Sequence, residues 1–466
     1  MKSTFFLIAL LFITNICTAE VTVKEDYRII NDTLEESKIT VLVPNETNNK
    51  LLLLAHGLRM GDAPLTSVIS HKSKFLQELL KEGWIIASTS YRRNGLILHD
   101  AIDDIENLRK YIETEYGKQN EIYIKGSSMG GKIITLIAEQ KTSPYTAVMG
   151  IGSALHITEE GNPDDLTFSP QIPILFLSNQ SETKSPENYM KSFKSGKIKP
   201  VLWIVDRDGH CNTNSEEELL VFRALLEFTK GNEIENNKHI LFDSSQREST
   251  AKFEDGKAFA KVMSLSQTYG NLIAEFCQND LIKLGIEKDT FFEVGYKDKV
   301  YKILWGTTYS DVNYGFWIAF ITSEGYLKIA RNFKNAVNLL KCSVDDEIYI
   351  LKRDNQTIPK SNAKADSLGN LAWGELLQNN PAEAEKYTLE ALKISPDTKW
   401  LTMNLAHCYL LGGKVEEAKK IFTANKGQKI LDGSFYFEDF VIEDIEYFRK
   451  EKIENEYFDE IIELMK

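Results

Sequence analysis

The sequence predicts an α/β protein whose first half folds as a mainly parallel sheet flanked by helices. Between residues 21 and 230, short apolar runs rich in β-branched residues alternate with longer amphipathic segments, which is typical of a sheet covered by helices. The first strands follow one another directly, so we expect an antiparallel start before the parallel strands. A mixed region and a helical region follow, because 466 residues exceed the usual size of one domain.

Apolar periodicity places the strands and helices of this first region, which we assign to residues 20–231. Strands are expected at 21–23, 38–44, 50–57, 84–90, 121–126, 146–153, 173–179 and 200–206. Helices are expected at 70–83, 99–117, 130–141, 185–196 and 215–230. Strands that alternate with helices in this way are typical of one layered domain with a single sheet.

The first 19 residues are typical of a secretory signal peptide. Lys2 precedes an apolar run at 5–13, and two small residues stand before Glu20. This run is shorter than the ~20 apolar residues that a membrane-spanning helix needs, and no later segment supplies such a run. We therefore expect a secreted or periplasmic protein with a cleaved leader and no membrane span.

Composition and charge exclude several classes of protein. Hydrophobic residues make up 42% of the chain and charged residues 26%, which is ordinary for globular proteins and argues against a disordered chain. The formal net charge is -13, and no block of lysines and arginines covers a segment. A nucleic-acid partner is therefore not expected, because binding to phosphates depends on such basic surfaces.

Cysteine usage indicates neither a zinc site nor a disulfide scaffold. Beyond the leader, the cysteines are widely spaced and form no CxxC pair. We expect these cysteines to be free thiols packed as small apolar residues. Export of the protein would still permit a disulfide between two of them. The four are Cys211, Cys277, Cys342 and Cys408. No metal and no cofactor are expected.

The mixed region, at 232–360, carries no motif that assigns it to a known type. The segment 260–286 has the pattern of a helix, and the aromatic-rich segment at 299–320 follows it. Aromatic side chains more often fill a core than line a site, so we expect these to be structural.

The C-terminal region, 361–466, contains two stretches that resemble tetratricopeptide repeats. The stretches 365–398 and 399–427 align at the repeat length of about 34 residues. Two repeats are fewer than stability normally needs, so we expect the helix at 437–451 or the mixed region to cap the stack. A groove for a protein partner and an adaptor that packs against the rest of the chain both remain open. The aligned pairs are Ala372 with Ala406, Ala384 with Ala418 and Thr388 with Phe422, and Pro396 closes the first stretch.

The most specific motif is Gly-Ser-Ser-Met-Gly at 126–130, which follows an expected strand and opens an expected helix. Such a tight turn crowds the backbone around its central serine, so only glycine fits two residues to either side. Ser128 would then project at the end of the sheet beside a helix N-terminus, where developing negative charge is stabilised. The motif predicts Ser128 as a nucleophile and the backbone N–H of Met129 as an oxyanion donor.

A second turn follows the apolar strand expected at 50–57. It contains His56 and Gly57, and the backbone N–H of Leu58 is the natural second oxyanion donor if the two strands are neighbours. We expect His56 to hold this turn by hydrogen bonds. Arg59 is expected in solvent, with contact to an anionic group of a substrate as the alternative.

A serine hydroxyl needs a base within hydrogen-bond reach, and His210 has the right setting. It follows the last apolar strand and precedes a helix, at the sheet end that carries Ser128. The acid that orients the histidine should follow the preceding strand, where Glu182 stands. Asp206 and Asp208, on the histidine loop itself, remain alternatives for this acid.

Residues 38–230 resemble the α/β-hydrolase fold, in particular its dienelactone-hydrolase-like and prolyl-oligopeptidase-like branches. In this family the acid stands ahead of a proline, as Glu182 stands ahead of Pro186. The tract between the strands at 146–153 and 173–179 is short, so the resemblance implies an open site without a large lid. The matching segments are HGLRMG, STSYRRNG, HDAIDDIENLRKYI, GSSMGGK, the strand before Glu182, and Gly209-His210.

The resemblance implies a serine hydrolase that works through an acyl-enzyme. His210 would deprotonate Ser128, and the amides of Leu58 and Met129 would hold the oxyanion. A small carboxylic ester is the first expected substrate, and a peptide is the alternative because the fold does not fix the leaving group. In a different class of function, the first region would be catalytically inactive and the chain would bind a partner through its helical repeats.

Overall fold

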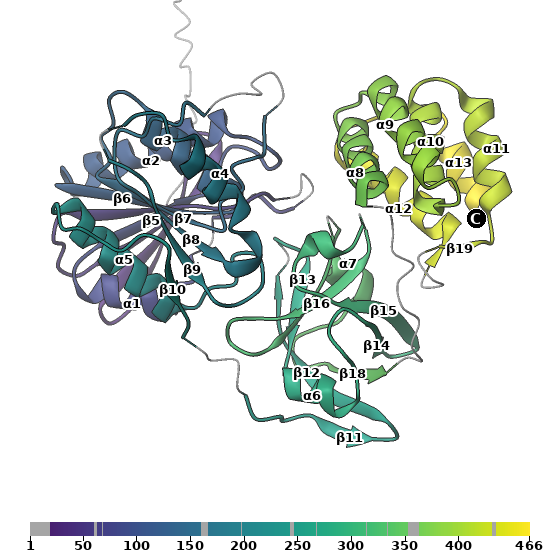
Figure 1. The fold of residues 1–466 in the computed structure, drawn as a ribbon, viewed down its shortest axis with the longest axis horizontal. Coiled ribbons are helices and arrows are strands. Elements are labelled where there is room, and N and C mark those ends of the chain that lie inside the picture. The colour runs from purple at the N-terminus through teal and green to yellow at the C-terminus, as the bar shows by residue number, and fades with distance from the viewer. Residues whose placement is uncertain are drawn as a thin grey trace, which may run out of the picture.

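The computed structural model describes three regions: a sheet with helices on both faces, a β-barrel and a helical C-terminal region (Figure 1). The expected signal peptide, 1–19, lies outside the described residues except for its last residue. Within the described part of the chain, no helix combines the length and apolar character needed to cross a membrane. The described residues are 19–466 without 60–62, 68, 160–165, 197, 243–246, 267, 314, 333, 353–362 and 431–434.

The first region is built on a 10-stranded sheet with the order β1-β2-β3-β5-β4-β6-β7-β8-β9-β10. The pairs from β1 to β5 are antiparallel, and those from β5 through β4 to β10 are parallel. The strands are β1 Glu20–Val23, β2 Tyr27–Leu34, β3 Ser37–Pro44, β4 Lys50–Ala55, β5 Ile85–Thr89, β6 Glu121–Ser127, β7 Ala147–Ile151, β8 Ile174–Asn179, β9 Val201–Val205 and β10 Lys238–Ile240.

Two helical layers bury the two faces of this sheet, as Figure 1 shows. Because strand side chains alternate, Leu51 and Leu53 of β4 enter one core while Leu52 enters the other. Helices α2, α3 and α4 cover the first core, and α1 and α5 cover the second. Their bounds are α1 Lys74–Lys81, α2 His99–Tyr116, α3 Met129–Glu139, α4 Lys184–Ser192 and α5 Ser215–Thr229.

Strand β2 was not expected from the sequence. The polar side chains of Asn31 and Asp32 interrupt its apolar pattern, yet every residue of β2 pairs with β3. Backbone hydrogen bonds to a well-patterned neighbour therefore define this strand where its own periodicity does not.

The second region is a closed β-barrel. Strand β12 pairs with both β13 and β18, and β14 pairs with both β15 and β18, so the sheet order β11-β12-β13-β17-β16-β15-β14-β18 closes on itself. Closure leaves the barrel strands without a free edge. The elements are β11 Lys252–Glu254, β12 Lys257–Ser266, β13 Asn271–Ala274, α6 Gln278–Lys283, β14 Phe291–Tyr296, β15 Lys299–Trp305, η2 Tyr309–Asp311, β16 Trp317–Ile321, β17 Leu327–Arg331, α7 Ala336–Leu340 and β18 Glu347–Lys352.

The helix expected at 260–286 is wrong over most of its length. The segment forms strands β12 and β13, and only α6 is helical. Ala258, Ala260 and Val262 are buried at every second position, which is strand periodicity. Gly270 turns the chain between the two strands with a φ of +64°, a conformation that glycine adopts at low cost.

The C-terminal region is helical, and its consecutive helices pack side by side. Small side chains allow the close approach: Ala372 and Ala406, aligned in the two stretches, are both fully buried. Helix α12 packs into the same core, as expected for the helix at 437–451. The elements are α8 Ala363–Leu377, α9 Pro381–Ile394, α10 Lys399–Leu411, α11 Val415–Asn425, β19 Lys429–Ile430, β20 Phe435–Tyr436, α12 Phe437–Lys450 and α13 Phe458–Met465.

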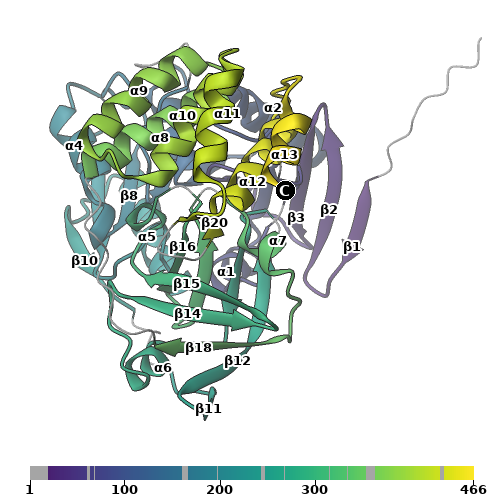
Figure 2. The same cartoon turned by 90° about the vertical axis from the view of Figure 1, so that its right-hand side faces the viewer.

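A buried ionic cluster joins the barrel to helix α12. Arg331 at the end of β17 donates to Glu443 at 2.6 and 3.0 Å, and Lys334 lies 2.8 Å from Asp444. His407 of α10 contacts Asp444 at 3.1 Å. Burial alone would raise the pKa of Glu443, but the charges of Lys334 and Arg331 hold it well below its usual value. Figure 2 shows the resulting arrangement, with the helical region above the barrel.

The cluster predicts that Asp444→Ala destabilises the fold by about 3–5 kcal/mol, toward the lower end because Glu443 still pairs with Lys334. The loss follows from leaving buried cationic and polar groups without their partner. Urea unfolding followed by far-UV circular dichroism measures it. Glu383→Ala, which removes an exposed pair with Lys386, is the control and should leave the unfolding curve unchanged. Equal curves for the two variants would contradict this account.

Candidate active site

The turn from β6 into α3 places Ser128 at the carboxyl edge of the sheet. Ser128 adopts a φ of 57° and a ψ of -117°, a strained conformation for a residue other than glycine. The flanking glycines are required by close approach. A methyl group on Gly130 would lie 2.1 Å from the carbonyl oxygen of Ala55, and one on Gly126 would lie 2.2 Å from the carbonyl oxygen of Gly130.

The structure brings Ser128, His210 and Glu182 into one hydrogen-bonded chain. The Oγ of Ser128 lies 2.9 Å from Nε2 of His210, and Nδ1 of His210 lies 2.5 Å from Oε2 of Glu182. Both ring nitrogens of the histidine are thereby engaged. In this arrangement the carboxylate orients the imidazole, and the imidazole can accept the proton of the serine hydroxyl.

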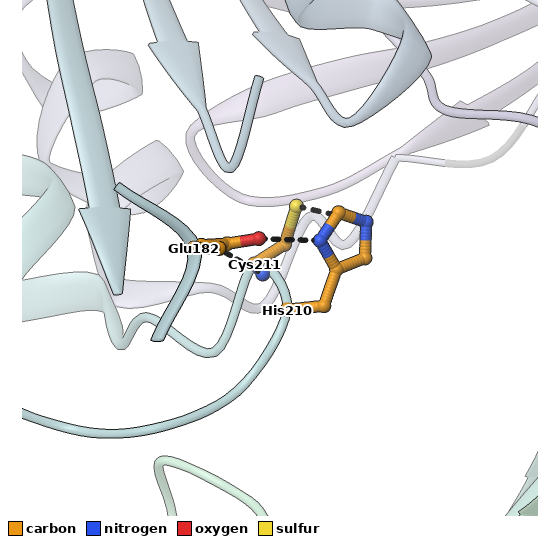
Figure 3. A group of neighbouring side chains, drawn as sticks. All are labelled: Glu182, His210 and Cys211. Carbon is orange, nitrogen blue, oxygen red and sulfur yellow. Dashed lines mark hydrogen bonds and ion pairs between the residues drawn. The ribbon is translucent and has the colours of Figure 1, made fainter. Parts of the chain in front are cut away.

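Glu182 is held in place by backbone and loop contacts. It belongs to the short helix η1, Gln180–Glu182, directly after β8, and its other oxygen accepts the backbone N–H of Cys211 at 3.0 Å. The side chain of Asn179 exchanges two hydrogen bonds with the backbone of Asn212, at 2.8 and 2.9 Å. The acid loop and the histidine loop therefore form one unit (Figure 3).

The other two candidate acids lie elsewhere. Asp206 contacts His239 at 2.5 Å, and Asp208 pairs with Lys288 of the barrel at 2.7 Å. The structure thus assigns to Glu182 the contact with His210 that the sequence left open.

The backbone amides of Leu58 and Met129 are the oxyanion donors that the sequence predicts. The turn after β4 lies against the serine, since a methyl group on Gly57 would come within 3.0 Å of the Ser128 Cβ. Among the described residues, the amides of Leu58 and Met129 have no hydrogen-bond acceptor. Met129 is also the first residue of α3, where the helix dipole favours negative charge.

His56 holds its turn by hydrogen bonds, as predicted, whereas Arg59 is buried rather than in solvent. His56 contacts the carbonyl oxygens of Gly57 at 2.7 Å and Ser90 at 3.1 Å, and it stacks on Tyr91. Burial, followed by the charge of Arg59, lowers the pKa of His56 to about 4, so the ring is neutral. The solvent position expected for Arg59 is wrong, because its side chain is buried and donates to the carbonyl oxygen of Thr66.

Cys211 is a neighbour of the catalytic candidates that sequence analysis did not single out. Its Sγ lies 3.9 Å from Nε2 of His210 and 3.3 Å from the carbonyl oxygen of Ile151. The Cys211 side chain is the largest cause that raises the pKa of His210 well above its usual value, and Glu182 adds to it against the effect of burial. Only its position directly after the histidine could have pointed to this role.

The barrel contacts the loop that carries His210. Asn212 of the histidine loop donates to the carbonyl oxygen of Ile321 at 3.1 Å, and Ser323 donates to the carbonyl oxygen of Thr213 at 3.0 Å. Both barrel residues lie at the β16–β17 turn. No local pattern in the sequence could have shown this contact, because it joins residues about 110 positions apart.

A cleft of about 720 Å³ opens beside the serine turn, between the first region and the barrel. Most of its lining, including Gly57 and Ser127, comes from the first region, and Tyr269 and Glu324 come from the barrel. Ser127 and Ser128 thus face different surroundings, because only Ser128 contacts His210.

Among the described residues, Glu182, His210 and Cys211 form the one group whose ligand atoms lie close enough together to bind a metal ion. Ligand atoms of Glu182, His210 and Cys211 lie within 4.8 Å of one another (Figure 3). Both ring nitrogens of His210 already have partners in Glu182 and Ser128. The contacts therefore fit a proton-transfer chain better than a metal centre.

Comparisons with known proteins match the chain in two separate parts. The family model of the SAM hydroxide adenosyltransferase C-terminal domain matches residues 261–349, within the barrel. A structure of an uncharacterised conserved protein from Thermotoga maritima is 23% identical, with a TM-score of 0.21, over 28% of this chain and 49% of that one. This chain thus spans about half the length of that protein. No curated protein matches the chain.

Two further solved structures that are similar to this chain are those of esterases. The esterase Pf2001 of Pyrococcus furiosus is 16% identical, with a TM-score of 0.33, over 44% of this chain and 92% of that one. Est1E from Butyrivibrio proteoclasticus is 14% identical, with a TM-score of 0.30, over 44% of this chain and 98% of that one. The N-terminal region resembles the α/β-hydrolase fold, with a mostly parallel sheet. The family model that matches is not a tetratricopeptide model, so that assignment stays a prediction.

The site predicts that His210 titrates above the usual value of about 6.5 and that Cys211→Ser lowers its pKa. The hydroxyl of a serine at position 211 does not ionise in this pH range. The substitution therefore removes the largest contribution to the raised pKa of His210, while the contribution of Glu182 remains. Histidine ring NMR across a pH series, with His210→Gln to assign the signal, measures both values. Cys342→Ala, in the barrel core, is the control and should leave the His210 pKa unchanged. An unchanged pKa in Cys211→Ser would refute the assigned cause.

Proposed function

We propose that this chain is a serine hydrolase that cleaves small carboxylic esters through an acyl-enzyme. The observation that carries the proposal is the hydrogen-bonded chain from Ser128 through His210 to Glu182, at 2.9 and 2.5 Å. A strained serine at a strand-to-helix turn, a base and an orienting acid together provide what nucleophilic acyl transfer needs.

The proposed mechanism follows from the contacts. At a pH above its raised pKa, His210 is neutral. It then accepts the proton of Ser128 while the serine oxygen attacks the ester carbonyl, and Glu182 stabilises the imidazolium that forms. The amides of Leu58 and Met129 hold the negative charge on the carbonyl oxygen. His210 then gives its proton to the leaving alcohol, and water attacks the acyl-enzyme by the same steps in the second half-reaction.

The barrel contact favours a small ester over a peptide. The β16–β17 turn lies against the loop that carries His210, so less room is open to an extended polypeptide than to a short acyl chain. A peptidase nevertheless uses the same groups, and it remains the second candidate within this class.

Two further assignments belong to the proposal. Export as a secreted or periplasmic protein is supported by the leader sequence at 1–19. A protein partner for the tetratricopeptide-like helices is supported by the repeated alanine pattern, and an inactive, partner-binding protein is the alternative function.

The proposal predicts that a fluorophosphonate probe labels the purified mature protein on Ser128. Ser128→Ala should abolish labelling, and His210→Ala should slow it by about a thousandfold or more, since each removes a member of a unit that acts together. Gel fluorescence after timed labelling measures these rates. Parallel assays with para-nitrophenyl esters and with peptide para-nitroanilides then distinguish esterase from peptidase.

Ser127→Ala is the matched control for this experiment. It removes the hydroxyl of the adjacent serine, which does not contact His210, and should be labelled at the wild-type rate. A wild-type protein that resists the probe and hydrolyses neither substrate class would contradict the proposal. That result would favour the alternative of an inactive protein that binds a partner.

A further inference from the structure

Cys211 is turned toward the imidazole of the residue before it. It adopts a φ of 50°, a left-handed conformation that is uncommon for residues other than glycine. Adjacent side chains of an extended chain point to opposite sides, so this turn brings the thiol and the ring of His210 together. The Cys211 Sγ lies 3.9 Å from Nε2 of His210 (Figure 3). The backbone therefore holds a sulfur beside the nitrogen that faces the serine.

The thiol of Cys211 and the carboxylate of Glu182 border one small space. A methyl group on Gly152 would lie 2.6 Å from the Cys211 Sγ and 2.7 Å from a carboxylate oxygen of Glu182. Gly152 has a φ of +51°, so both its conformation and its surroundings exclude a side chain. This glycine lets the sulfur, the carboxylate and the imidazole of His210 approach one another, and their ligand atoms all lie within 4.8 Å.

These three side chains carry the kinds of donor atom that Zn²⁺ binds in proteins. Zinc binds a thiolate sulfur at ~2.3 Å and an imidazole nitrogen at ~2.1 Å, so two such ligands of a tetrahedral ion lie about 3.6 Å apart. The 3.9 Å between Sγ of Cys211 and Nε2 of His210 is close to this value. Glu182 holds the opposite ring nitrogen, Nδ1, at 2.5 Å, which is how a carboxylate commonly orients a metal-binding histidine. His210 and Cys211 therefore form a pair of zinc ligands, and the outer partner of the ring is already in place.

A third donor atom and access from solvent complete the site. The Oγ of Ser128 lies 2.9 Å from the same Nε2 of His210, near enough to supply an oxygen ligand. The His210 side chain is 32% exposed, so an ion in solvent can reach it. The other cysteines in the described part of the chain are buried, whereas Cys211 is only partly covered. An ion from solvent therefore meets a thiol and an imidazole together at this position.

We infer that Zn²⁺ binds between Cys211 and His210 and inhibits the enzyme by occupying Nε2 of the histidine. Without the ion, this nitrogen contacts the Ser128 hydroxyl, whose proton it must accept during catalysis. A nitrogen bound to zinc cannot act as a base, so the ion competes with the proton and is an inhibitor, not a resident cofactor. Binding also converts the Cys211 thiol to a thiolate, and the proton of the thiol passes to solvent. The inhibition rests on the proposed hydrolase function, whereas the binding of the ion does not.

A cobalt titration of the purified mature protein tests the binding. Co²⁺ accepts the same ligands as Zn²⁺, and a thiolate bound to it gives a sulfur-to-cobalt absorption band in the near ultraviolet. We expect the wild-type protein to develop this band during the titration and to lose it when Zn²⁺ is added. Cys211→Ser should show no band. Cys342→Ala removes a thiol in the barrel core, so it is the matched control and should keep the band.

Inhibition of para-nitrophenyl acetate hydrolysis tests the consequence of binding. We expect Zn²⁺ to inhibit the wild-type protein and EDTA to restore the rate, with Cys342→Ala inhibited to the same degree. Each rate is taken relative to the same protein without zinc. Half-inhibition of Cys211→Ser should need at least about ten times more Zn²⁺, because losing even an outer partner of a ligand costs about tenfold to a hundredfold in metal affinity.

A third measurement needs no variant. Zn²⁺ should slow the alkylation of Cys211 by iodoacetamide in the wild-type protein, which peptide mass spectrometry measures. The inference is overturned by an absent cobalt band, by an alkylation rate that zinc leaves unchanged, or by equal zinc sensitivity of Cys211→Ser and the wild type. Each of these results leaves the hydrolase proposal standing. A band that Zn²⁺ displaces, in a protein that cleaves no ester or peptide, would support the site and count against the hydrolase proposal alone.

Discussion

The close approach of two backbone turns is the constraint on which the site depends. Helix α3 can begin directly after β6 only because Gly130 lies where any side chain would overlap the carbonyl oxygen of Ala55. Ser128 adopts its strained conformation in this turn, and Gly57 of the neighbouring turn lies directly against its side chain. Nucleophile and oxyanion donors are thus positioned by backbone packing, which the two helical layers around the sheet hold rigid.

The histidine loop is the second fixed element, and it is held from two directions. Asn179 and Glu182 bind it from the sheet side, and the Ile321 carbonyl binds it from the barrel side. A loop without regular structure needs such partners for its backbone and side-chain polar groups. The position of His210 therefore depends on the barrel as well as on the domain that contains it.

The sequence was informative where function depends on local geometry. The glycines at 126 and 130 predicted the turn that presents Ser128, and the order of strands placed Glu182 and His210 at the same sheet edge, where the structure brings them together. It failed where pairing is not local: β2 is defined by its neighbour, and the barrel strands at 257–274 have a mixed pattern that resembles a helix. The proximity of Cys211 to the site and the contact of the barrel with the histidine loop depend on packing between distant segments, which one sequence does not reveal.

Strand β17 also suggests what the helical region does for the site. The strand begins after the turn that contacts the histidine loop, and at its other end Arg331 is bound by Glu443 of α12. Because a strand is stiff and its register is fixed on both sides, the ionic cluster at one end limits how far the other end can shift. Coupling over such a distance would need an element with two arrangements, and a strand bound in one register does not supply one. The ionic contacts therefore join the C-terminal helices to strand β17 of the barrel, and the groove for a protein partner stays a prediction.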